Sequence, residues 1–220
     1  MSDIIDSKTY FLHIPKTGGN WLRSVLWDSG IKSIKTNTVS KHATYDLLCG
    51  ENSKKIFPQK VSWHIKFFCV VRHPLLWYQS WFKYQHSKGW RDWGENGNFR
   101  HWHCLSPLNM PIQDDFNEFM RIVNRNTPGF LTHLYHSYIL PSGAKFLKNE
   151  NLREELLLLN KDWSLGLNEE VIKYQNALNV SSKSQIYWDE KVLKETLENE
   201  SALLKKYGYS EKSETIVNIN

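Results

Sequence analysis

Residues 10–26 read YFLHIPKTGGNWLRSVL, and this stretch decides the fold of the chain. It opens with a run of β-formers from Tyr10 to Ile14, which Pro15 ends. A lysine and two glycines follow, and then apolar residues recur at the spacing of one helix face: Trp21, Leu22, Val25 and Leu26. The pattern predicts a strand at about 8–14, a tight loop, and a helix over about 19–29 that Gly30 closes.

The loop between this strand and this helix suits an anionic group. A helix start leaves backbone N–H groups without intrahelical partners and carries the positive end of the helix dipole. Gly18 and Gly19 let the backbone approach an oxyanion closely, and Lys16 adds a mobile positive charge. The alternative is an ordinary strand-to-helix turn in which Lys16 is only solvated, and a short glycine-rich loop alone does not separate the two.

Length and composition bound the class of protein. With 220 residues, 40% hydrophobic and 23% charged, the chain is long enough for one globular domain and short for two, so we expect a single domain over 1–220. The net charge of +5 favours an anionic partner without choosing between a nucleotide, a polyanionic sugar and nucleic acid. The three cysteines show no paired spacing and the first residues show no signal-peptide pattern. We therefore expect a cytoplasmic protein with no membrane partner.

A second strand–turn–helix pattern lies at residues 65–85. The run from Ile65 to Val71 is apolar on both faces apart from Lys66, which is typical of a central parallel strand. Arg72 follows it, and Pro74 suits the first position of a helix. Both patterns place a helix N-terminus at the carboxyl end of a strand, where open α/β sheets bind ligands.

The rest of the chain completes an α/β pattern. Apolar spacing predicts helices at about 41–48, 114–125, 130–138, 152–159 and 189–207. Asp189 is expected to cap the last of these helices, and Gly208 lies just beyond its end. A weak strand is expected within 31–40 and a short strand at 144–147. The segment 89–111 is aperiodic and rich in tryptophan, which is more often functional than structural. We predict a P-loop-like, doubly wound α/β fold with a mainly parallel sheet flanked by helices and a helical C-terminal part.

The segment from His13 to Gly19 resembles the 5′-phosphosulfate loop of the sulfotransferases that use 3′-phosphoadenosine-5′-phosphosulfate (PAPS). The nucleoside-triphosphate loop differs, because its lysine follows the glycines. The family usually carries Thr-Ser where this chain has Asn20 and Trp21, but backbone contacts do not depend on those side chains. The resemblance implies a soluble relative of the Golgi carbohydrate sulfotransferases.

Arg72 and Ser80 resemble the family's site for the 3′-phosphate of the donor. A guanidinium can bind two phosphate oxygens and a serine adds another hydrogen bond, although both residues could instead be ordinary surface groups. Residues 146–152 resemble the family's strand ending in Glu-Asn-Leu, and Lys183 lies where relatives carry a basic residue that reaches the phosphates; a solvated lysine is the alternative. The resemblance implies a donor site formed by Pro15, Lys16, Thr17, Gly18, Gly19, Asn20, Trp21, Arg72, Ser80 and Lys183.

Lys16 and His42 are the expected catalytic residues. The acceptor hydroxyl needs a base, and His42 lies on the segment between the two loops where relatives carry a catalytic His or Glu. His42 could instead be a surface residue, His64 could face the site in its place, and His13 could serve only to shape the loop. Lys16 would stabilise charge on the departing 5′-phosphate, so no metal is required.

The expected reaction is transfer of a sulfuryl group from PAPS to a hydroxyl, with a saccharide as the expected acceptor and 3′,5′-adenosine bisphosphate as the second product. Two alternatives stay open: a nucleotide-dependent kinase on a related P-loop fold, and a basic, aromatic-rich nucleic-acid-binding protein. In the favoured interpretation we expect no nucleic-acid partner beyond the donor nucleotide.

Overall fold

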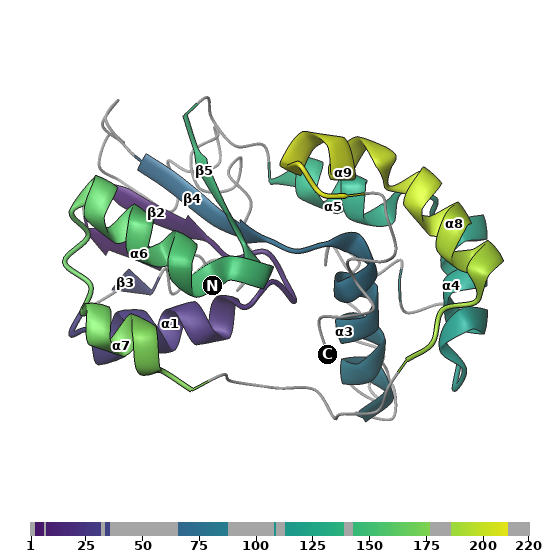
Figure 1. The fold of residues 1–220 in the computed structure, drawn as a ribbon, viewed down its shortest axis with the longest axis horizontal. Coiled ribbons are helices and arrows are strands. Elements are labelled where there is room, and N and C mark those ends of the chain that lie inside the picture. The colour runs from purple at the N-terminus through teal and green to yellow at the C-terminus, as the bar shows by residue number, and fades with distance from the viewer. Residues whose placement is uncertain are drawn as a thin grey trace. The chain divides into compact units, whose positions relative to one another are not determined.

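The structure is a computed structural model that describes residues 3–6, 8–31, 34–35, 66–87, 108, 113–138, 143–176 and 186–210 (Figure 1). The chain divides into two compact units, each made of two separate segments. Unit 1 contains Met1–Arg72 and Ser137–Val180, and unit 2 contains His73–His136 and Ser181–Asn220. The single domain expected over residues 1–220 stays a prediction.

Unit 1 is built on a five-stranded sheet with the order β3-β1-β2-β4-β5. Its parallel part contains β2 (Thr9–Leu12), β4 (Lys66–Val71) and β5 (Lys145–Lys148). As its apolar sequence predicts, β4 lies in the middle of these three strands. The edge is antiparallel, because β1 (Asp3–Asp6) pairs in that direction with both β2 and β3 (Ile34–Lys35).

The fold is thus α/β, but the sheet is mixed. The prediction of a mainly parallel sheet holds only for β2, β4 and β5. The physical reason is the short connection between β1 and β2, which run from Asp3 to Asp6 and from Thr9 to Leu12. A connection of so few residues can join antiparallel strands, whereas parallel strands need a crossover of about a dozen residues or more. The strand β1, which lies before residue 8, is not among the predicted elements.

Three helices of unit 1 pack on one face of this sheet. They are α1 (Gly19–Asp28), α6 (Leu152–Trp163) and α7 (Glu169–Tyr174), and they share one apolar core with Phe11, Phe68 and Val70 of the strands. Figure 1 shows α6 across the strands and α7 beside α1. Each large apolar side chain buried in this core contributes about 1.5–3 kcal/mol. The other face is also buried, at Leu12, Cys69 and Val71; helices covering it, which a doubly wound sheet requires, stay a prediction.

Unit 2 is helical in its described residues. It contains α3 (Pro74–Ser87), α4 (Phe116–Asn126), α5 (Phe130–Ser137), α8 (Glu190–Asn199) and α9 (Ser201–Tyr207). The predicted helical C-terminal part is therefore present, and Asp189 caps α8 as expected by accepting a hydrogen bond from the Val192 N–H at 3.1 Å. The single helix predicted over 189–207 is wrong, because the helix breaks at Glu200.

Glu200 gives the physical reason for that break. Its carboxylate is buried, with 1% of the residue exposed. It accepts hydrogen bonds from the N–H groups of Leu131 and Thr132 at 3.0 and 2.8 Å and from the Thr132 hydroxyl at 2.6 Å. The Tyr78 hydroxyl donates a fourth, also at 2.6 Å. Glu200 thereby caps the start of α5, a long-range contact that the apolar spacing of residues 189–207 cannot indicate.

Some predictions fall outside the described residues. These include the short helix at 41–48 and all of the tryptophan-rich segment 89–111 except Leu108, which is buried. Within the part of the chain that the structure describes, no helix has the length and apolar character needed to cross a membrane.

Replacing Tyr78 by Phe should destabilise unit 2 by about 1.5–3 kcal/mol, because it removes a hydrogen bond to a buried carboxylate. Burial and then the neighbouring Glu200 raise the pKa of the Tyr78 hydroxyl well above its usual value of about 10. A raised folded-state pKa means that the hydroxyl contributes its full stability below about pH 10 and loses it as the pH rises through the folded-state value. The free energy of unfolding, measured with urea, should therefore fall above pH 10 by more in wild type than in Tyr78→Phe.

The control is Tyr174→Phe, since Tyr174 is 75% exposed. Equal stability of Tyr78→Phe and wild type at neutral pH would contradict the role given to this contact.

Candidate functional site

Three strand ends of unit 1 meet at one edge of the sheet. The strands β2, β4 and β5 are parallel and paired in register, with Leu12 beside Cys69 and Val71 beside Lys148. Their carboxyl ends therefore lie together, and a different segment leaves from each: residues 13–18 from β2, Arg72 from β4 and Asn149 from β5. This is the edge at which open α/β sheets bind ligands.

The segment at residues 13–19, called here the anion loop, has an alternating backbone. Lys16 and Gly18 have positive φ angles of 63° and 91°, whereas Thr17 between them and Gly19 after them do not. Alternation between left-handed and right-handed residues curves the chain so that successive N–H groups line a concavity, and such nests bind anions. A positive φ is common for glycine but costs about 1–2 kcal/mol for a residue such as lysine.

The start of α1 continues this concavity. Gly18 is the N-cap residue, and no side chain of the described residues donates or accepts a capping bond there. The first bond of the helix runs from the Leu22 N–H to the Gly18 carbonyl at 3.2 Å. The N–H groups of Gly19, Asn20 and Trp21 therefore have no acceptor within the helix, and together with the helix dipole they favour an anion.

Both glycines are required by their neighbours. A Cβ atom on Gly19 would lie 2.2 Å from the His13 ring, and one on Gly18 would lie 2.6 Å from the Asn149 amide nitrogen and 3.3 Å from the Leu152 side chain. His13 is buried, with 3% exposed, and its ring occupies the space that a side chain at Gly19 would need. This contact supports the expectation that His13 shapes the loop.

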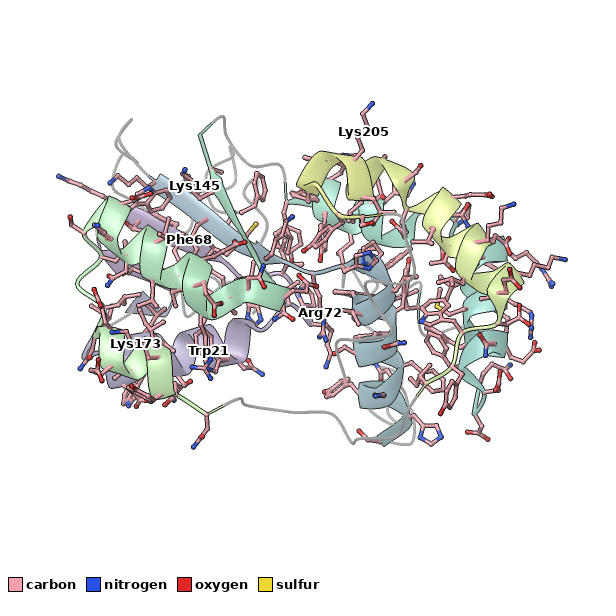
Figure 2. All side chains as sticks on the ribbon, in the orientation of Figure 1. Trp21, Phe68, Arg72, Lys145, Lys173 and Lys205 are labelled. Atoms are coloured by element: carbon pink, nitrogen blue, oxygen red, sulfur yellow. The ribbon has the colours of Figure 1, made fainter. Side chains whose placement is uncertain are left out.

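Two of the predicted donor-binding side chains point into unit 1. The Thr17 hydroxyl donates to the Ile14 carbonyl at 2.9 Å and the residue is fully buried. The Trp21 indole (labelled in Figure 2) donates to the Gln175 carbonyl at 3.3 Å, and the centre of its ring lies 5.1 Å from the Arg153 guanidinium. At these two positions the contact with an anion would come from the backbone N–H groups.

Arg72 joins the two sequence motifs within unit 1. It follows β4 directly (Figure 2), and its Nη1 donates to the Lys16 carbonyl at 3.3 Å, 56 residues away in sequence. The bond holds the one lysine of the loop that adopts a positive φ. A guanidinium carries several N–H donors, so this role in the loop is compatible with a second role in binding an anion.

The start of α3 in unit 2 is capped by its own chain. The Leu75 N–H donates to Nδ1 of His73 at 3.3 Å, which places the proton of the neutral ring on Nε2. Nε2 in turn donates to the Ser210 carbonyl at 3.3 Å. Pro74 has no N–H. The helix start after Arg72 therefore offers an anion fewer N–H groups than the start of α1.

For the remaining predicted residues, a position at this edge stays a prediction. Ser80 is half-buried on α3 and belongs to unit 2, whereas Arg72 is the last residue of the first segment of unit 1. The pairing of Arg72 with Ser80 at a 3′-phosphate stays a prediction. His42, His64 and Lys183 lie outside the described residues.

The turn after β5 is held by a carboxylate of α6. Glu155 accepts a hydrogen bond from the Lys148 N–H at 2.6 Å. Burial raises the pKa of Glu155, and the hydrogen bond from Lys148 opposes that rise. The contact fixes the start of the short 3₁₀ helix Asn149–Asn151, whose first residue reaches the anion loop.

Comparison with known proteins adds no relative: no family model matches the chain, and neither a curated protein nor a solved structure matches it.

Asn149 is a residue of this site that the sequence did not single out. Its amide donates a hydrogen bond to the Thr17 carbonyl at 3.1 Å. The available signals were a polar residue directly after a strand at this edge and the resemblance of residues 146–152 to the family's strand end. Among the described residues, no group of three or more metal-binding side chains occurs.

Replacing Gly19 by Ala should lower the stability of unit 1 by about 1–3 kcal/mol, because the added methyl group would overlap the His13 ring. The loss should be smaller when His13 is already Ala, and a double-mutant cycle followed by urea unfolding should give a coupling of about 0.5–3 kcal/mol. Gly30→Ala is the control: Gly30 has a φ of 77° but open space around its Cβ position. That change should destabilise without coupling to His13, and additive losses for Gly19 would contradict the contact.

Proposed function

We propose that the protein is a sulfotransferase that moves a sulfuryl group from PAPS to a hydroxyl group. The observation that carries the proposal is the anion loop, in which HIPKTGG adopts an alternating backbone at the uncapped start of α1. A loop of this conformation suits a phosphate group. The resemblance of the same residues to the 5′-phosphosulfate loop selects PAPS as the donor.

The residues present suit the 5′-phosphate of this donor. The side chains of Asn149 and His13 occupy the places that Cβ atoms on Gly18 and Gly19 would take, and the N–H groups of Gly19 and Asn20 lie in the first turn of α1. Lys16 is half-buried at the same loop and would add positive charge. The 3′-phosphate would be bound by Arg72 and Ser80, with Lys183 as a further contact.

The reaction would be an in-line displacement at sulfur. The acceptor oxygen forms a bond to sulfur while the bond from sulfur to the 5′-phosphate oxygen breaks, and 3′,5′-adenosine bisphosphate leaves with an added negative charge. Lys16 and the N–H groups of the loop would stabilise that charge as it develops. The hydroxyl proton would pass to His42, with His64 as the second candidate. We propose a saccharide as the acceptor.

The first test concerns the nucleotide. Wild type should bind 3′,5′-adenosine bisphosphate more tightly than 5′-AMP, ATP–Mg²⁺ or an oligonucleotide, and a concentration of about a hundred times Kd should stabilise it by about 2.7 kcal/mol. Arg72→Ala should remove most of the preference for the bisphosphate over 5′-AMP, and Ser80→Ala a smaller part, because a hydrogen bond from a charged group is the stronger. Isothermal titration measures each affinity.

Because Arg72 also holds the Lys16 carbonyl, Arg72→Ala should weaken 5′-AMP slightly as well. An equal loss for both nucleotides would exclude the 3′-phosphate site, and tighter binding of ATP–Mg²⁺ by wild type would favour the kinase.

The second test concerns Lys16. Lys16→Gly removes the charge and suits the positive φ of this position, so the fold should be kept. We expect the turnover of labelled sulfate from PAPS to fall about 10²–10³-fold, while the affinity for 3′,5′-adenosine bisphosphate changes much less. Lys8→Ala, at the opposite end of β2, is the matched control and should be fully active. Unchanged turnover in Lys16→Gly would remove this lysine from the mechanism.

A further inference from the structure

Asn149 contacts the anion loop from a distant part of the chain. It follows β5 directly and is half-buried. Its Nδ2 atom donates to the Thr17 carbonyl at 3.1 Å, across 132 residues of sequence. The same nitrogen occupies the place that a Cβ on Gly18 would take, 2.6 Å from that position. The amide of Asn149 and the missing side chain of Gly18 are therefore complementary.

This contact determines the direction of a peptide unit in the loop. No cis peptide bond occurs in the described residues, so the carbonyl of one residue and the N–H of the next point in opposite directions. With the Thr17 carbonyl bound to Asn149, the Gly18 N–H points away from Asn149. With the Lys16 carbonyl bound to Arg72, the Thr17 N–H likewise points away from Arg72. Two successive carbonyls are thus held by side chains from two other strand ends.

We propose that Asn149 is a positioning residue for the anion loop: by holding the Thr17 carbonyl, it directs the Gly18 N–H toward the bound phosphate group. This inference rests on the proposed function insofar as the bound group is the 5′-phosphate of the donor. The Asn149 side chain contacts the loop backbone and not the anion, so its effect on the anion acts through the Thr17–Gly18 peptide. Arg72 cannot replace it, because Arg72 holds the preceding peptide.

Two substitutions separate orientation from packing. Asn149→Ala removes the donor and leaves space beside Gly18. Asn149→Asp keeps the size of the side chain but places a carboxylate oxygen, which cannot donate, against the Thr17 carbonyl oxygen. It also adds negative charge beside the loop. Asn151→Ala is the matched control, since Asn151 lies in the same 3₁₀ helix, is exposed and makes no capping bond from its side chain.

Binding is measured with two probes on the full chain. Inorganic phosphate is followed by the amide resonance of Gly18, and 3′,5′-adenosine bisphosphate by isothermal titration. We expect both affinities to fall about threefold to tenfold in Asn149→Ala and further in Asn149→Asp, and to stay at the wild-type level in Asn151→Ala. The free Gly18 amide should also shift in both Asn149 variants.

The two probes distinguish the inference from the function on which it rests. If phosphate binds at Gly18 and weakens in the Asn149 variants, but the bisphosphate binds wild type no better than phosphate, the inference stands and the sulfotransferase proposal fails. If wild type binds the bisphosphate tightly and both Asn149 variants bind it equally well, Asn149 has only a structural role, whatever their melting temperatures. If phosphate does not shift the Gly18 amide of wild type, the inference is wrong.

Discussion

Parallel pairing of β2, β4 and β5 is the constraint on which the site depends. Parallel strands present their carboxyl ends at the same edge, so the segments that leave them must meet there. The bond from Arg72 to the loop spans 56 residues of sequence and the bond from Asn149 spans 132. Neither contact could form without the register that sets Leu12 of β2 beside Cys69 of β4 and Val71 of β4 beside Lys148 of β5.

The anion loop stores conformational strain that these contacts offset. Lys16 adopts a positive φ that costs about 1–2 kcal/mol for a non-glycine residue. Thr17 closes the loop from within by its bond to Ile14, and the His13 ring packs against Gly19. A loop held in this way would present its N–H groups before an anion arrives, so the proposed binding would require little reorganisation. The strained backbone conformation at Lys16 is therefore the same one that the proposed function uses.

Unit 2 depends on a different kind of contact. An unpaired buried carboxylate would be strongly destabilising, but Glu200 has hydrogen-bond donors from Tyr78, Leu131 and Thr132. The geometry that satisfies it also divides the C-terminal helical segment into α8 and α9. A polar contact between distant residues thus overrides the local preference for one continuous helix.

The sequence by itself determined most elements of the described fold. Spacing and end signals, which are local properties of the chain, predict the strand before the anion loop and the central strand β4. They also predict the helices α1, α3, α4, α5 and α6 and the caps at Asp189 and Gly208. The sequence also predicted the loop at residues 13–19, whose binding of an anion stays a prediction. Only the tertiary structure decided the antiparallel edge, the short helix α7, the break at Glu200, and the inward direction of the Thr17 and Trp21 side chains. It alone assigned Arg72 and Asn149 to two successive carbonyls of the loop. The reason is that hydrophobic period and helix caps act over a few residues, whereas a hydrogen bond between strand ends depends on the path of the chain between them, which no local pattern encodes.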